Sequence, residues 1–181
     1  MAEARGQSRR DLGITALVLG FFAAAWFGWS GGGAPDGWQP FLTVGSVVGL
    51  AVAVAGAVVG FRSRTATTLS QDRAASRRYG IIVGIEFAAI ALGGIVLGVA
   101  GAAEYVAAWV CLVVGVHFFP LAPVLRDPLL VPLGALVCAA AVVATVVGLT
   151  TGVAASFVAG LGAGVLLLVY SSAALVRGLR S

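Results

Sequence analysis

Six apolar runs, each about 20 residues long, make up most of this chain and are separated by short polar segments. An α-helix of about 20 residues rises about 30 Å, the thickness of the hydrocarbon core of a bilayer. The composition agrees, because 60% of the residues are hydrophobic and 10% are charged, whereas a soluble domain carries about 25% charged residues. The sequence therefore predicts an all-α, polytopic integral membrane protein.

We expect one transmembrane domain over residues 1–181, with no separate soluble domain. The first apolar run follows a basic segment, as in a signal peptide, but it exceeds the about 7–15 apolar residues of such a peptide and is interpreted as an uncleaved span. In the fourth span, Pro120 and Pro123 predict a last turn that is kinked or unwound. The six spans are predicted at residues 12–30, 40–61, 79–100, 105–124, 129–149 and 153–176.

The distribution of charge predicts the orientation of these spans. All eleven basic residues are arginines, and six spans with a cytoplasmic N-terminus place every one of them on the cytoplasmic side. The outer loops then carry only the acids Asp36 and Glu104. We expect both termini in the cytoplasm and the chain in the cell (plasma) membrane. The arginines before the third span are interpreted as orientation signals, with binding of anionic lipid or pyrophosphate as a secondary hypothesis: Arg73, Arg77 and Arg78.

Short turns and small residues predict how the helices pack. The turn at residues 101–104 is too short to separate the third and fourth spans, so they are expected to be antiparallel neighbours. The second span carries two glycine pairs at four-residue spacing, which fit close contacts between membrane helices: Gly45 with Gly49 and Gly56 with Gly60.

Several kinds of chemistry are not expected. The chain has no lysine, so it has no phosphate-binding loop of the GxxxxGK type. Its single histidine and two cysteines lack the spacing of a zinc site, and Cys111 and Cys138 are interpreted as packing residues. We expect no metal and no cofactor. Because the arginines flank the spans, the net charge of +4 is not taken as a sign of nucleic-acid binding.

Glu86 and His117 are the only Glu and the only His expected inside the bilayer. Each lies about eight or nine residues from the nearest cytoplasmic arginine of its span, and Tyr170 lies about seven, which puts all three at roughly 10–14 Å from the arginines. A carboxyl group within a membrane costs about 2.5–3.5 kcal/mol and marks function more often than not. We therefore interpret Glu86 and His117 as a catalytic pair. The aromatic residues expected around them, as substrate-binding residues, are Tyr79, Phe87, Phe118, Phe119, Tyr170 and Phe22.

Structural roles remain open for the same residues. In the structural interpretation, Glu86 is a neutral carboxyl group that forms a hydrogen bond across a helix interface, and His117 caps a carbonyl that Pro120 leaves free. Tyr170 suits an interface anchor or a packing residue.

One acid, one partner histidine and nearby aromatic residues suit proton-initiated chemistry on a carbon chain. In this reading Glu86 protonates an alkene or epoxide of an isoprenoid, and His117 strengthens it as an acid. The segments IEF at Glu86 and GVHFFP at His117, together with the chain's size, hydropathy and single intramembrane acid, resemble the small membrane-bound terpene cyclases of bacteria. That resemblance implies cyclisation of an isoprenoid, by isomerase or lyase chemistry, in a bacterial inner membrane.

Two other functions fit the sequence. A small transporter or channel subunit would use Glu86 and His117 as a proton relay, although the other polar residues of the spans are few and scattered in depth. A membrane scaffold without chemistry would tolerate replacement of Glu86 by Gln. The expected partners are the lipid bilayer and an apolar small molecule, with no nucleic acid, and the glycine-rich helices permit a homo-oligomer.

Overall fold

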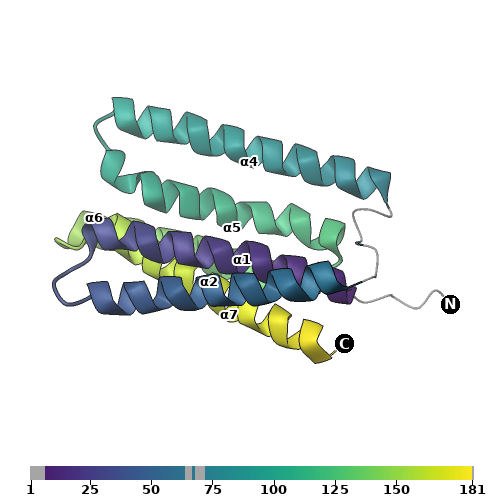
Figure 1. Ribbon diagram of the computed structural model, residues 1–181. Helices are drawn as coiled ribbons and strands as arrows, with labels where there is room; N and C mark the ends of the chain where they lie inside the picture. The colour runs from purple at the N-terminus through teal and green to yellow at the C-terminus, as the bar shows by residue number, and fades with distance from the viewer. Residues whose placement is uncertain (1–6, 64–66, 68–71, 181) are drawn as a thin grey trace.

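Six long helices form the computed structural model, which describes residues 7–63, 67 and 72–180. All six are long and apolar enough to cross a membrane, and the described residues contain no strand, so the all-α prediction is confirmed (Figure 1). Arg5 and Arg64, which the expected orientation assigns to the cytoplasm, lie outside the described residues. The helices are α1 (Arg9–Ser30), α2 (Gln39–Arg62), α4 (Arg73–Val99), α5 (Val106–Leu125), α6 (Leu130–Thr150) and α7 (Ala155–Arg180), with 3-10 turns η1 (Gly31–Gly33) and η2 (Ala103–Tyr105).

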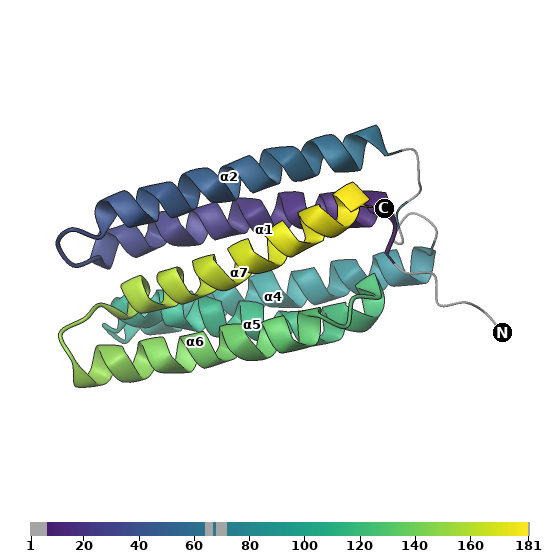
Figure 2. The ribbon, with the colours of Figure 1, turned by 90° about the horizontal axis from the view of Figure 1, so that it is seen from below.

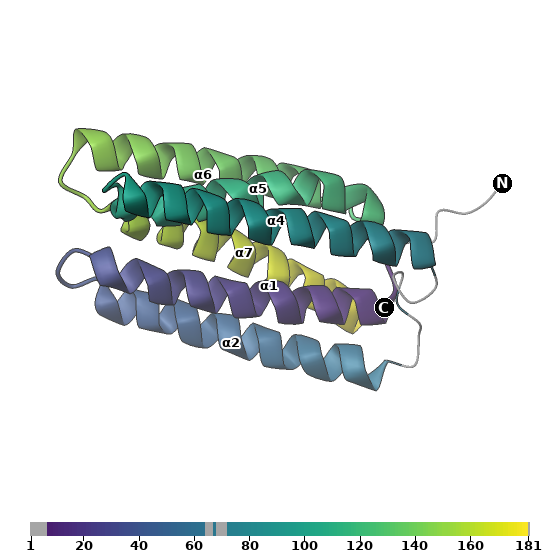
Figure 3. The ribbon, with the colours of Figure 1, turned by 90° about the horizontal axis from the view of Figure 1, so that it is seen from above.

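Consecutive helices pack as three hairpins, α1 with α2, α4 with α5 and α6 with α7, and the expected pairing of the third and fourth spans is therefore observed. Helices α1 and α2 lie on one side of the bundle and α4, α5 and α6 on the other, while α7 passes obliquely between the two groups (Figures 2 and 3). Helix α1 begins and α7 ends at the same end of the bundle, which we call the terminal end. The opposite end, with η1 and η2, is called the hairpin end.

Glycines bring α1 and α2 into backbone contact. A Cβ atom added at Gly56 would lie 2.5 Å from the backbone nitrogen of Leu17, and one added at Gly13 would lie 2.4 Å from that of Gly60. A Cβ atom at Gly49 would lie 2.9 Å from the backbone nitrogen of Ala24. The predicted close contacts at the glycine pairs of the second span are therefore confirmed.

Helix α4 begins at Arg73, six residues before the predicted span. The carboxylate of Asp72 accepts hydrogen bonds from the backbone nitrogens of Ala74 and Ala75 at 2.9 and 3.1 Å and so caps the first turn. The three arginines interpreted as orientation signals consequently lie on the first two turns of a helix and not in a connecting loop.

Of the two alternatives predicted for the last turn of the fourth span, kinked or unwound, the unwound one is wrong. Helix α5 includes both Pro120 and Pro123 and continues to Leu125. Each proline removes only one backbone donor, and packing of α5 along α4, α6 and α7 holds the helix despite that loss. The helix ends at Arg126, which is left-handed with φ 54°, and the Asp127 nitrogen then donates to the Ala122 carbonyl at 3.0 Å.

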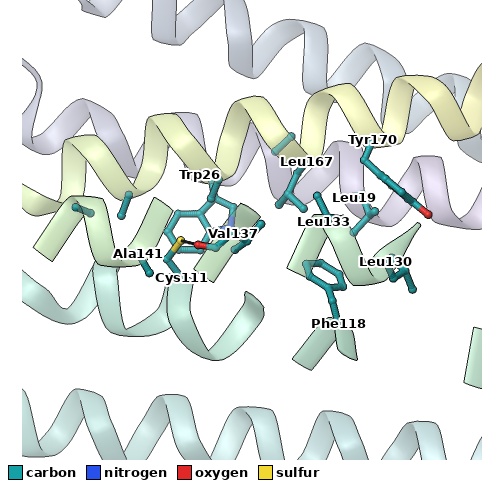
Figure 4. Packing of buried hydrophobic residues seen from close by; sticks show 14 of the residues in the cluster. Leu19, Trp26, Cys111, Phe118, Leu130, Leu133, Val137, Ala141, Leu167 and Tyr170 are labelled. Carbon is teal, nitrogen blue, oxygen red and sulfur yellow. Dashed lines mark hydrogen bonds between the residues drawn. The ribbon is translucent and has the colours of Figure 1, made fainter. Parts of the chain in front are cut away.

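The main core is built from small and branched side chains of α1, α5, α6 and α7 (Figure 4). Leu167 and Val137 are among its fully buried members. The Cys111 thiol contacts the Val137 carbonyl at 3.4 Å, and both Cys111 and Cys138 are free, as expected of packing residues. Helix α4 contributes no buried residue to this core, so it packs on the outside of the bundle.

Candidate functional site

The structure brings Glu86 of α4 and His117 of α5 into contact. Oε2 of Glu86 lies 3.1 Å from Nδ1 of His117, and the two side chains are only 14% and 11% exposed. The two atoms are close enough for an ion pair, but their bond directions are not those of a hydrogen bond, so Nδ1 of His117 has no aligned partner. The contact joins an acid and a base that lie 31 residues apart in the sequence.

A tryptophan sets the register that makes this contact possible. Nε1 of Trp109, on α5, donates to the backbone carbonyl of Ala89 on α4 at 3.1 Å, about one helical turn from Glu86. The indole reaches α4 because residue 93 is glycine: a Cβ atom there would lie 2.0 Å from Nε1 of Trp109. Gly93 and Trp109 thus hold α4 at the height at which Glu86 meets His117.

The pair lines a cavity of about 530 Å³. Three helices form most of its walls, and each contributes one face at helical spacing, while Leu130 of α6 and Leu167 of α7 complete the lining. The volume falls in the range of about 300–1,000 Å³ that is usual for small-molecule sites. The lining residues of α4 are Tyr79, Val83, Glu86, Phe87 and Ile90, those of α5 are Val110, Val114, His117, Phe118, Leu121 and Leu125, and those of α1 run from Asp11 to Trp29.

Polar groups are distributed unevenly along the cavity. The polar side chains at the terminal end of the lining are Gln7, Asp11, Thr15, Thr67, Tyr79 and Asp127. Toward the hairpin end, beyond the Glu86–His117 pair, the described lining is aliphatic or aromatic, with the indoles of Trp26 and Trp29 as its only polar edges. The cavity is therefore amphipathic along its length, with the acid and the histidine near the boundary between its two parts.

Four of the six aromatic residues expected around the pair line the cavity: Tyr79, Phe87, Phe118 and Phe22. Phe119 is not among the lining residues, since its ring lies near Gly134 on the side of α5 that faces α6. Tyr170 is buried behind the wall, and its hydroxyl donates to Oδ2 of Asp127. Its position therefore makes it a support for a lining residue, which is closer to the packing interpretation than to substrate contact.

Asp127 is the site residue that reasoning from the sequence missed, because an Asp in an Arg-Asp-Pro turn resembles a solvated turn residue. Its side chain is only 2% exposed. Besides the Tyr170 hydroxyl, it accepts a hydrogen bond from the Leu129 nitrogen at 3.2 Å, and the guanidinium of Arg177 lies 5.9 Å from the centre of the Tyr170 ring. Helix α7 runs obliquely through the bundle (Figure 2), and the hydrogen bond from the Tyr170 hydroxyl to Asp127 shows that Tyr170 reaches the turn. Counting residues along straight helices does not reveal that approach.

No arginine is among the described lining residues, so Arg73, Arg77 and Arg78 do not form part of the cavity wall. Comparisons of the chain with protein-family models, with curated proteins and with solved structures found no match. The likeness to bacterial terpene cyclases stays a hypothesis.

Proposed function

We propose that this protein is a multi-pass enzyme of the cell membrane, with cytoplasmic termini, that cyclises an isoprenoid-type substrate by protonating it. The observation that carries the proposal is the contact of Glu86 with His117 on the wall of a cavity that is otherwise mostly apolar. A carboxyl group held in such a place has few roles in packing, and it lies where a hydrocarbon chain would fit.

In the proposed reaction Glu86 is the acid. With an alkene, its O–H bond breaks as a C–H bond forms on one alkene carbon, which leaves a carbocation and a carboxylate. With an epoxide, the proton goes to the epoxide oxygen and a C–O bond breaks, which leaves a hydroxyl group and a carbocation. A second double bond of the same chain attacks the cation and closes a ring. The cyclic cation then loses a proton to water, from which the Glu86 carboxylate regains one, and an alkene is formed, so that the overall reaction is an isomerisation. His117, 3.1 Å from Glu86, orients the carboxyl group and stabilises the carboxylate once the proton has left.

The surrounding side chains suit a cation that must survive long enough to rearrange. The ring faces of Phe22, Phe87 and Phe118 line the same cavity and attract positive charge through their quadrupoles. The aliphatic wall beyond the pair offers no nucleophile to trap the cation and favours exclusion of water.

Transport is the weaker candidate, because the polar lining is confined to one part of the cavity. Beyond Glu86 and His117 the described wall is aliphatic or aromatic up to Trp29, which does not suit the passage of an ion or a hydrophilic solute. A scaffold role explains the contact between α4 and α5 but assigns no use to the cavity.

The test compares Glu86→Gln with Glu104→Gln, which makes the same change in an exposed residue of η2. The wild-type protein in lipid nanodiscs is supplied with linear isoprenoid alkenes, alcohols and terminal epoxides in D2O, and products are analysed by mass spectrometry. We expect cyclic products, with one deuterium on the protonated carbon where an alkene is protonated and an added hydroxyl group where an epoxide is opened. We also expect a loss of turnover of at least about 10²-fold in Glu86→Gln, a smaller loss in His117→Ala, and no change in Glu104→Gln. Full activity of folded Glu86→Gln, or no cyclic product from any probe, would refute the proposal.

A further inference from the structure

The shape of the cavity indicates the shape of its ligand. On α1 its lining runs from Asp11 to Trp29, which corresponds to about 27 Å along the helix axis. That length approaches the about 30 Å thickness of a hydrocarbon core. A site so elongated, with polar groups at one end only, matches a molecule with one long apolar chain and one polar head.

The cavity is also open toward the side of the bundle. Phe22 of α1 and Phe87 of α4 both line it, and they are 46% and 63% exposed. Helix α4 packs mainly on α5 and η2, and the ribbons of α1 and α4 lie apart (Figure 3). Phe22 and Phe87 therefore lie on the two sides of the opening, one on each of these helices. For a chain embedded in lipid, this opening faces the hydrocarbon region, from which an apolar ligand can enter the cavity laterally.

The polar end has a definite chemistry. Asp11 and Asp127 place two carboxyl groups at it, and Gln7, Thr15, Thr67 and Tyr79 add an amide and hydroxyl groups, while the described lining holds no basic side chain. The Asp11 carboxylate also accepts hydrogen bonds from the Ser8 nitrogen and hydroxyl at 3.3 and 2.9 Å. Asp127 is 2% exposed and fixed by Tyr170 and the Leu129 nitrogen, so it cannot turn away to make room for an anion. A phosphate placed there would stand beside these carboxylates, and like charges weaken binding. A head that donates hydrogen bonds suits these acceptors.

We propose that the cavity binds a single-chain amphiphile whose head is a hydrogen-bond donor without negative charge, such as an alcohol, and lies between Asp11 and Asp127. Its chain follows α1 toward Trp29. The proposal rests on the proposed function in one respect: the carbon that Glu86 protonates then lies about 10–15 Å along the chain from the head. This length follows from the helical rise over seven positions from Tyr79 to Glu86 and over ten positions from His117 to Asp127.

The experiment measures binding without turnover, in nanodiscs of zwitterionic lipid. The probes are a linear isoprenoid alcohol and the monophosphate of the same alcohol, each brominated at the chain end remote from the head, and the readout is quenching of tryptophan fluorescence. We expect the alcohol to quench and the quenching to fall in Trp29→Phe. The phosphate should bind about tenfold more weakly or worse, because of the like charges at the polar end.

Two variants connect this preference to the polar end. In the double variant Asp11→Asn and Asp127→Asn the preference for the alcohol should shrink toward unity. If that variant does not fold, Gln7→Arg adds a positive charge to the same lining and should strengthen binding of the phosphate. Equal or tighter binding of the phosphate to the wild-type protein, or stronger quenching of Trp29 by an alcohol brominated next to its head, would overturn the proposal.

Failure of this inference differs from failure of the proposed function. Glu104→Gln should bind the alcohol as the wild-type protein does, since Glu104 is exposed in η2 and is not a lining residue. If the protein prefers the alcohol but cyclises no probe, the proposed ligand class is supported and the proposed cyclase function is refuted. If a probe is cyclised but the phosphate binds best, the cyclase stands and the head chemistry proposed here is wrong.

Discussion

Helices α2 and α4 are both long, apolar and rich in glycine, yet they join the bundle in different ways. Glycines of α2 face α1 so closely that added Cβ atoms would collide with backbone, as at Gly49 and Gly56. On α4 most glycines face open space, and Gly84 has no heavy atom within 4 Å of an added Cβ atom. The same residue type therefore makes a tight joint in one helix and an unoccupied surface in the other.

This difference in packing distinguishes a tightly packed part of the molecule, α1, α2 and α7, from α4, which forms a loosely packed wall of the cavity. Backbone contact along α1 and α2, together with α7, leaves little room for adjustment. Helix α4 has no buried residue, and it is held by contacts of side chains with α5, among which are those of Glu86 with His117 and of Trp109 with Ala89. The two walls of the cavity thus differ in packing, with backbone contact on the α1 side and side-chain contact on the α4 side.

The largest effect is expected where the tight joint is broken. In Gly56→Ala the new methyl group would lie 2.5 Å from the Leu17 nitrogen and 2.8 Å from the Gly13 carbonyl, so α1 and α2 must separate. We expect a loss of about 1–3 kcal/mol, or roughly 2–10 °C in the midpoint of thermal unfolding. Gly28→Ala on α1 is the matched control, because its methyl group meets nothing within 4 Å. Equal unfolding midpoints for the two variants would contradict the tight backbone contact between α1 and α2, and with it the contrast to α4.

A smaller effect is expected where the wall is loosened. Trp109→Phe removes the hydrogen bond to the Ala89 carbonyl and should cost about 0.5–1.5 kcal/mol. Because the bond holds α4 on α5, the loss should appear as faster hydrogen exchange in α4 than in α2, measured by mass spectrometry in nanodiscs. Trp38→Phe is the control, since Trp38 packs on Phe157 near α2 and not on α4. An equal increase in the rate of hydrogen exchange in all helices would indicate general destabilisation, and it would contradict the proposal that this hydrogen bond specifically holds α4 on α5.

Reasoning from the sequence recovered the parts of this molecule that depend on local pattern. Apolar runs and short turns are enough for six helices in hairpins, and depth counting is enough to bring Glu86 and His117 to one level. It failed where packing decides. Two prolines did not unwind α5, because its neighbours support it, and burial of Asp127 depends on the oblique path of α7. Helices that are apolar all round do not reveal which face meets a neighbour, so Phe119 was expected at the cavity and lies outside it.

The smallest effect is expected on the exposed face of α4. Gly84→Ala adds a methyl group with no neighbour within 4 Å and restricts the unfolded backbone, so it should stabilise the helix by up to about 1 kcal/mol. Thermal unfolding should show an unchanged or slightly raised midpoint, in contrast to the fall expected for the same substitution at Gly56. Ligand binding should be unaffected, since Gly84 is not a lining residue. A clear fall in the unfolding midpoint would mean that the exposed face of α4 contacts another surface in the membrane. Helix α4 would then be closely packed, as α1 and α2 are.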